Sequence, residues 1–177
     1  QSNLCHLFGP RLCHWCRTTI LIQNPKNYGF SKAINIAADH CKGKHLLLLN
    51  PDTIVEKKSI QSLYDTLIED PEIAVVGAKI IDCDGKFQLS SRRAYPSFFT
   101  SLWQITGLSY LFPKSKTFGR YNYTYIENNI SHEVDSVSGA CMMFSKEHFV
   151  DLDGFDEAYF LFFEETDFCV RTKELGK

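Results

Sequence analysis

A single aspartate stands directly behind an uninterrupted apolar run. Residues 46–49 are all leucine, and Asn50-Pro51-Asp52-Thr53 follows them. Ligands of open α/β sheets bind beyond the carboxyl ends of the strands, so a carboxylate at this place faces the expected site. An oxygen ligand suits Mg²⁺ or Mn²⁺ shared with substrate phosphates. Aspartate also closes Asx-turns and caps helices, so position alone leaves both interpretations of Asp52 open.

A second group of carboxylates gathers near the end of the chain, at Glu164, Glu165 and Asp167, shortly after Asp156 and Glu157. Acidic residues in the first turn of a helix complement its dipole and can be purely structural. The preceding Phe160-Leu161-Phe162-Phe163 predicts a buried segment, where an unpaired charge is costly. A carboxylate in such surroundings binds protons more readily, as a general base must. We favour the functional interpretation.

The cysteines form no complete framework of a known kind. Cys13-His14-Trp15-Cys16 is formally a C-x-x-C motif, with Cys5 and His6 before it. A zinc site needs a second ligand pair at a fixed spacing, and the next cysteine, Cys41, stands alone. The odd count of seven also argues against a complete disulfide framework. We do not favour a metal or redox centre here, and we interpret the other cysteines as buried small apolar residues.

Strands and helices that would position the carboxylates alternate in the first half of the chain. Hydrophobic patterning predicts strands at residues 18–22, 45–49 and 73–76, and helices at 31–41 (with Ser31 as the N-cap) and 57–69. Such alternation predicts a largely parallel sheet with helices on its faces. The continuous apolar run through residue 49 predicts a strand inside this sheet rather than at its edge.

The second half is less regular. Asp82-Cys83-Asp84-Gly85 predicts a hairpin turn, and residues 90–133 show no firm period. A strand over 134–144, interrupted at Gly139, precedes helices at 146–152 and 164–175. No internal repeat and no second domain is evident.

Composition narrows the class of protein. The 177 residues fit one globular domain, and a net charge of -2 gives no basic stripe for nucleic acid. No run reaches the ~18–20 apolar residues that span a bilayer, and the N-terminus lacks a signal-peptide pattern, which predicts a cytoplasmic location. The aromatic share of 14% suits sugar rings, but we favour a role in the core.

Six segments together resemble the family 2 glycosyltransferases, and within them the bacterial rhamnosyltransferase-like enzymes. They come in the family's order: Asn24-Pro25-Lys26-Asn27-Tyr28-Gly29-Phe30, Leu48-Leu49-Asn50-Pro51-Asp52-Thr53, Asp82-Cys83-Asp84-Gly85, Ser138-Gly139-Ala140, Gly154-Phe155-Asp156-Glu157 and Phe163-Glu164-Glu165-Thr166-Asp167-Phe168-Cys169-Val170-Arg171. Each is weak alone, but their order and spacing are specific. The resemblance implies a GT-A-like α/β fold, a mostly parallel sheet flanked by helices.

The resemblance also implies roles for particular residues. Asn50-Pro51-Asp52 looks like the Asp-x-Asp motif with Asn in the first place, so Asp52 would bind Mg²⁺ or Mn²⁺ on the donor diphosphate. Glu164-Glu165 resembles the family's Glu-Asp pair, whose second member is the base, here Glu165. Residues expected to border the substrates are Asn27, Gly29, Asn50, Gly139 and Asp167.

The activity so implied is inverting transfer of a sugar, with rhamnose as one candidate, from a dTDP- or UDP-sugar to a glycan or lipid-linked acceptor in cell-surface polysaccharide synthesis. Such an enzyme would work at the inner face of the membrane, with peripheral association and homo-oligomers as further expectations. Residues 1–19 do not resemble the family, so we expect 20–177 to be a partial catalytic domain, truncated at both ends. The alternatives are a non-catalytic sugar- or nucleotide-binding fragment and a structural remnant.

Overall fold

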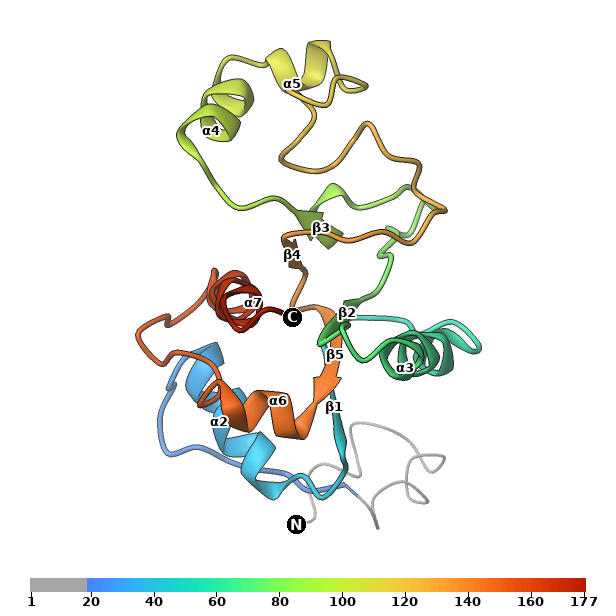
Figure 1. The fold of residues 1–177 in the computed structure, drawn as a ribbon. Helices are drawn as coiled ribbons and strands as arrows, with labels where there is room; N and C mark the ends of the chain where they lie inside the picture. Colours follow the sequence, from blue (N-terminus) through green and yellow to red (C-terminus); the bar gives the residue numbers. More distant parts are fainter. Residues whose placement is uncertain (1–18) are drawn as a thin grey trace.

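The structure is a computed structural model that describes residues 19–177 (Figure 1). The Cys13–Cys16 motif and its neighbours Cys5 and His6 lie outside the described residues. Of the other cysteines, Cys169 is buried as expected. The expected burial is wrong for Cys41 and Cys83, which are exposed because they stand at the end of a helix and in a turn. None of the described helices is long and apolar enough to cross a membrane.

A three-stranded sheet forms the centre of the described chain. Its strands are β1 (His45–Leu49), β2 (Val75–Gly77) and β5 (Cys141–Ser145), in the order β1-β5-β2. The central strand β5 is antiparallel to both neighbours, with Leu47 opposite Met143 and Val75 opposite Phe144. The expected largely parallel sheet is therefore wrong for the strands that the structure describes. β1 and β2 do run in one direction, but the later strand β5 enters between them.

The expected interior position of β1 is also wrong for the described strands, among which β1 stands at an edge of this sheet. Its two faces are nevertheless both covered. Leu46 and Leu48 join one buried cluster with Met142 and Phe144, whereas Leu47 packs against a second cluster around Met143. The leucine run thus reports burial on both faces correctly, but it carries no information on which strands are neighbours.

Two helices of the first half cover opposite faces. Helix α2 (Phe30–His40) contributes Ala38 to the cluster of Phe144, and helix α3 (Ser59–Glu69) contributes Leu63 and Leu67 to the cluster of Met143. Both helices were predicted, within two residues at each end. The N-cap of α2 is Gly29 rather than Ser31, which is buried inside the first turn.

The predicted strand at 18–22 is not formed by its described part. Residues 19–22 have no regular structure, and Ile20 and Leu21 are 64% and 66% exposed. A β-branched, apolar run becomes a strand only where a neighbouring strand pairs with it. The sequence signal was therefore real but insufficient.

A second, two-stranded sheet lies beyond the first (Figure 1). Strand β3 (Arg92–Arg93) follows the short helix η2 (Leu89–Ser91) and pairs antiparallel with β4 (Ser136–Val137). The predicted hairpin at 82–85 is confirmed by an Ile81–Phe87 bridge across a turn with Gly85 at φ 77°. The predicted break at Gly139 is confirmed too, because β4 and β5 end and begin on either side of it.

Residues 97–126, called the arm below, leave the two-stranded sheet and return to it (Figure 1). They contain helices α4 (Phe98–Ile105) and α5 (Leu108–Leu111). Ser97 caps α4 and forms a reciprocal capping box with Thr100, which begins this helix in a segment that shows no firm period.

Two helices from the end of the chain complete the fold. Helix α6 (Lys146–Asp151) follows β5 directly, and helix α7 (Glu164–Glu174) packs beside it through Phe168. The ring of Phe168 is fully buried, with centroids 5.0 Å from both Phe144 and Phe155 and 6.0 Å from Phe149. This aromatic cluster fixes the position of α7 against the central strand.

We expect Phe168→Ala to lower the free energy of unfolding by about 3–5 kcal/mol, the usual cost of truncating a buried aromatic side chain. Urea unfolding followed by far-UV circular dichroism measures the change. The control is Phe98→Ala, at a side chain that is 76% exposed, which should shift stability by no more than ~0.5 kcal/mol. Equal losses in both variants would contradict the assigned core.

Candidate functional site

Glu165 carries a buried carboxylate that has a cationic partner. It lies in the first turn of α7 and is 7% exposed. Its Oε1 accepts a hydrogen bond from Nη2 of Arg93, and the two side chains form an ion pair. Arg93 comes from β3, whose pairing with β4 sets it opposite Ser136. Ser136 in turn hydrogen-bonds Thr166 of α7 (Oγ to Oγ1, 3.2 Å). The second sheet and α7 are thus joined where the carboxylate and the guanidinium meet.

Gly139 and Asn50 extend this centre toward the end of β1. A Cβ at Gly139 would lie 3.7 Å from the Cβ of Glu165, so this glycine stands directly beside the carboxylate-bearing residue. The backbone N–H of Asn50 donates to the carbonyl of neighbouring Ala140 at 2.9 Å. The structure therefore brings Asn50, Gly139 and Glu165 together at the carboxyl end of β1, where an α/β sheet binds its ligands.

Asn27 and Gly29 form a turn at the start of α2. Asn27 Oδ1 accepts from the N–H of Gly29 at 2.9 Å, and Gly29 has a φ of 83°. A Cβ at Gly29 would collide with the carbonyl oxygen of Phe160, so only glycine fits there. Phe30 N–H donates to that same carbonyl at 2.8 Å. The turn at the start of α2 therefore packs against Phe160, in the segment before α7.

This segment corrects one expectation. Phe160, Leu161, Phe162 and Phe163 are 57%, 54%, 71% and 50% exposed, whereas the sequence predicted burial. Phe162 and Phe163 have φ values of 69° and 70°, in the left-handed region that bulky residues rarely adopt. The chain therefore turns sharply, so that the apolar side chains face outward and the next two carboxylates face inward. Such strain, of order 1–3 kcal/mol per residue, persists where surrounding structure imposes it.

Glu164 is the first residue of α7 and only 5% exposed. Its Oε2 is buried and has no hydrogen-bond partner among the described residues. Burial raises the pKa of this carboxyl above its usual value, its own backbone N–H lowers it, and the neighbouring Glu165 raises it further. Glu164 therefore differs from Glu165, whose carboxylate has a direct cationic partner.

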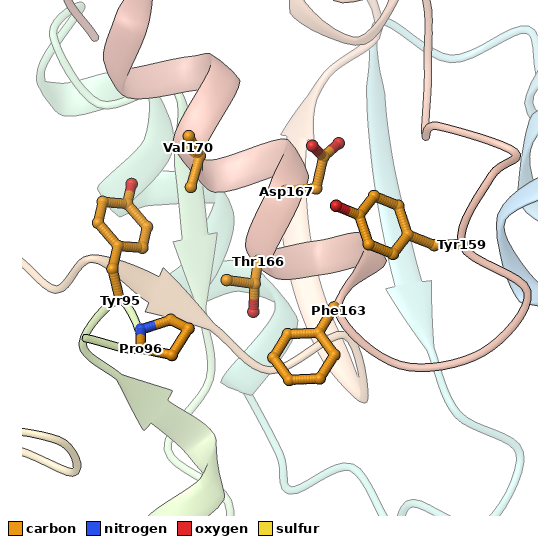
Figure 2. A pocket seen from close by; sticks show the side chains of 7 residues that line it. All are labelled: Tyr95, Pro96, Tyr159, Phe163, Thr166, Asp167 and Val170. Atoms are coloured by element: carbon orange, nitrogen blue, oxygen red, sulfur yellow. The ribbon is translucent and has the colours of Figure 1, made fainter. Parts of the chain in front are cut away.

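Asp167, also on α7, lines a hollow of about 430 Å³ (Figure 2). The other lining residues are Tyr95, Pro96, Tyr159, Phe163, Thr166 and Val170. Asp167 Oδ2 accepts from Arg171 at 2.7 Å, in an i,i+4 pair on the same helix. The hollow is mostly apolar, and Figure 2 shows aromatic rings on two of its sides.

Asp52 is exposed in the turn after β1, in which Thr53 Oγ1 donates to the carbonyl of Asn50 at 2.6 Å. The described residues contain no group of three or more His, Cys, Asp or Glu side chains placed to hold a metal ion. One free carboxylate nevertheless fits Mg²⁺ or Mn²⁺, because such ions are usually held by one or two carboxylates together with substrate phosphates.

Arg93 is the residue that sequence reasoning missed. The Nε of Arg93 is also buried without a hydrogen-bond partner among the described residues. The sequence offered only a faint signal: Arg92 and Arg93 adjoin in a segment without firm period, 72 positions from Glu165. Arg92 has a structural role, because it donates hydrogen bonds to the carbonyls of Tyr123 and Ile126.

Comparison with known proteins identifies the family of the chain. The family model for glycosyl transferase family 2 matches residues 12–152, which is most of the chain. The chain belongs to glycosyl transferase family 2. The match begins inside the N-terminal segment that was expected to lie outside the family. The resemblance to this family is thereby confirmed, and four of the six motifs lie within the matched residues.

Two relatives are named as sugar-transferring enzymes. The chain is 26% identical over 168 residues to the "Low-salt glycan biosynthesis hexosyltransferase Agl10" of Haloferax volcanii, covering 92% of this chain and 49% of that protein. It is 28% identical over 131 residues to the "N-acetylglucosaminyl-diphospho-decaprenol L-rhamnosyltransferase" of Mycobacterium tuberculosis, covering 74% and 42%. The chain thus spans about half the length of these relatives or less. No solved structure matches.

The raised pKa of Glu164 predicts a pH-dependent gain in stability for Glu164→Gln. Ionisation is less favourable in the folded than in the unfolded chain, so wild-type stability falls as the pH rises through 4.5, the ordinary value, toward the raised one. The variant should therefore have the higher urea midpoint at pH 7.5, and the difference should vanish near pH 4. Glu157→Gln is the control, because Lys32 lowers the pKa of Glu157 and its loss should give no gain. A variant destabilised at pH 7.5 would mean that the charge of Glu164 is needed.

Proposed function

We propose that this domain catalyses inverting transfer of a sugar from a nucleoside diphosphate donor to an acceptor hydroxyl, with Glu165 as the general base. The observation that carries the proposal is the buried Glu165 carboxylate, held by Arg93 and placed beside Gly139 at the carboxyl end of β1. Family 2 membership supports the class of reaction.

The reaction needs one proton transfer and one displacement. The acceptor oxygen attacks the anomeric carbon from the side opposite the diphosphate, and its proton passes to the Glu165 carboxylate. The bond from the anomeric carbon to the diphosphate breaks, and its electron pair leaves with the nucleotide. One base without a protein nucleophile gives inversion, by the single-displacement logic of inverting glycosidases.

The donor end of the site is assigned to the turn after β1. Asp52 would hold Mg²⁺ or Mn²⁺ on the donor diphosphate, and the ion would neutralise charge on the leaving group. Asn50 borders the same turn through its bond to Ala140. Of the remaining predicted residues, Asn27 and Gly29 support the loop before α7, and Asp167 lines the hollow where a substrate group can lie.

The donor and acceptor follow the relatives. One is named for rhamnosyl transfer to a decaprenol-linked N-acetylglucosamine and the other for hexosyl transfer in glycan synthesis. We extend to this chain a dTDP- or UDP-sugar donor, with rhamnose as one candidate, and a glycan or lipid-linked acceptor of cell-surface polysaccharide synthesis. For such an acceptor we propose the inner face of the membrane as the place of the reaction. The exposed edge of β1 would support self-association, since edge strands recruit partners.

We expect Glu165→Gln to lower kcat about 10²–10⁴-fold while leaving donor affinity nearly unchanged, because the amide keeps the shape but accepts no proton. Release of nucleoside diphosphate measures turnover, and calorimetry with a non-hydrolysable donor measures affinity. Glu164→Gln serves as the matched control and should change kcat far less. Full activity of Glu165→Gln would assign the base to another carboxylate, with Glu164, Asp156 and Asp167 next.

Arg93 should act through Glu165. We expect Arg93→Met to lower kcat with little change in the KM for donor, and Arg93→Lys to recover part of the loss, since lysine restores the charge but not the fork. In a double-mutant cycle, adding Arg93→Met to Glu165→Gln should cause little further loss, because residues that act as a unit are non-additive. Two fully additive losses would separate the role of Arg93 from that of Glu165.

Asp52→Asn should weaken donor binding and rate together, since the metal contact acts in the ground state and in the transition state. A thermal shift that requires both Mn²⁺ and UDP or dTDP should be lost in this variant. Tight binding of Mn²⁺ without nucleotide would contradict the shared site. Intact donor binding without turnover by the wild-type chain would instead favour the alternative of a non-catalytic sugar- or nucleotide-binding fragment, and absence of both a structural remnant.

A further inference from the structure

The arm, residues 97–126, exposes an unusual amount of apolar surface. Its outer face consists of side chains 63–85% exposed, called the apolar face below: Phe98, Phe99, Ile105, Tyr110 and Leu111. The polar Thr100 and Ser109 of the same two helices are instead buried. Helices in water normally show the reverse pattern, and large apolar side chains gathered on an exposed segment indicate a binding surface.

The apolar face is held in place by packing beneath it. Trp103 and Phe118 meet edge to face with centroids 5.0 Å apart, and Phe112 packs on Phe118 at 5.6 Å. The capping box of Ser97 and Thr100 fixes the start of α4. The arm therefore has an aromatic cluster of its own, and Phe99 of the apolar face stacks on Trp103 of this cluster with centroids 6.3 Å apart.

Charge is distributed just as unevenly as apolar surface. The whole chain carries a net charge of -2, yet residues 85–126 contain six charged side chains that are all basic. Three of these, Lys114, Lys116 and Arg120, follow α5 directly and are exposed. Within residues 19–177 none of the three forms a salt bridge. Three exposed cations thus follow the apolar helices in the chain, whereas the protein as a whole has a net negative charge.

We propose that the arm is a membrane-docking element, whose apolar face enters the interface of a lipid bilayer that carries anionic headgroups. Aromatic side chains favour the headgroup level, and helices that lie in this plane combine an apolar face with lysine and arginine. The short helices α4 and α5, of eight and four residues, would lie in the interface rather than span it.

Charge favours the bilayer over a second copy of this chain as the occupant. A two-fold dimer through the apolar face would use the same patch on both copies. Lys114, Lys116 and Arg120 of the two copies would then be brought close together, with no acidic residue in the arm of either to compensate. An anionic surface complements the same three side chains.

The arm begins at the candidate site. Tyr95 and Pro96, which line the hollow beside Asp167, stand directly before Ser97 and α4 (Figure 2). In Figure 1 the arm lies at the end of the molecule away from the three-stranded sheet. The chain that lines one wall of the hollow would consequently lead directly into the membrane-bound arm. This gives the lipid-linked acceptor of the proposed function a route to the site, but docking itself does not depend on catalysis.

Co-sedimentation of the whole chain with vesicles tests the proposal. We expect binding to vesicles of phosphatidylcholine with phosphatidylglycerol, weak binding to phosphatidylcholine alone, and a loss of binding at high salt. Replacing Lys114, Lys116 and Arg120 together by Gln should lower the partition coefficient roughly 100-fold, at about fivefold per cation. Phe98→Ser with Phe99→Ser should also release the protein.

The controls carry matched changes elsewhere on the surface. Ile54→Ser removes a side chain that is 95% exposed, and Lys42, Lys44 and Lys57 together changed to Gln remove the same charge; both should bind as the wild type does. Glu165→Gln should bind vesicles normally, which separates docking from catalysis. Binding unaffected by the arm variants, or none to anionic vesicles, would overturn the proposal. A dimer in sedimentation velocity that Phe98→Ser with Phe99→Ser dissolves would assign the face to a second copy.

Discussion

The charge of Glu165, taken out of water beside Arg93, is the constraint around which the described fold is arranged. A buried carboxylate needs a partner with good geometry, and removing either member of such a pair leaves an uncompensated charge. The pair therefore requires β3, which carries Arg93, to stay paired with β4, and α7, which carries Glu165, to stay packed through Phe168. The contact thus joins the two-stranded sheet to a helix from a distant part of the chain.

Local signals in the sequence predicted the elements well and their arrangement poorly. Helical periodicity, the hairpin turn at 82–85 and the break at Gly139 depend on neighbouring residues, and the structure bears them out. The order of the strands depends on contacts between residues about 95 positions apart, such as Leu47 with Met143, and no local pattern encodes these. The alternation of strands and helices in the first half correctly predicted that β1 and β2 run in the same direction. It could not predict that β5, from the second half, would lie between them.

The candidate site divides in the same way. The order of six motifs was enough to bring out the family and to select Glu165, Gly139 and Asn50, which the structure brings together. Arg93 could not be found, because an arginine in a short strand looks the same whether it faces water or a carboxylate. The burial of the segment before α7 was misjudged for a related reason. Apolar composition predicts burial on average, but two left-handed residues at Phe162 and Phe163 turn these side chains outward.

The clamp between Gly29 and Phe160 has a consequence for motion at the site. Phe30 N–H and Ser31 Oγ both donate to the loop before α7, to the carbonyls of Phe160 and Tyr159, each at 2.8 Å. The loop cannot swing away from the site unless both bonds break or the start of α2 travels with it. The amide proton of Phe30 is consequently a native reporter of this opening. Its exchange with solvent deuterium counts the fraction of time for which the loop stands free of α2.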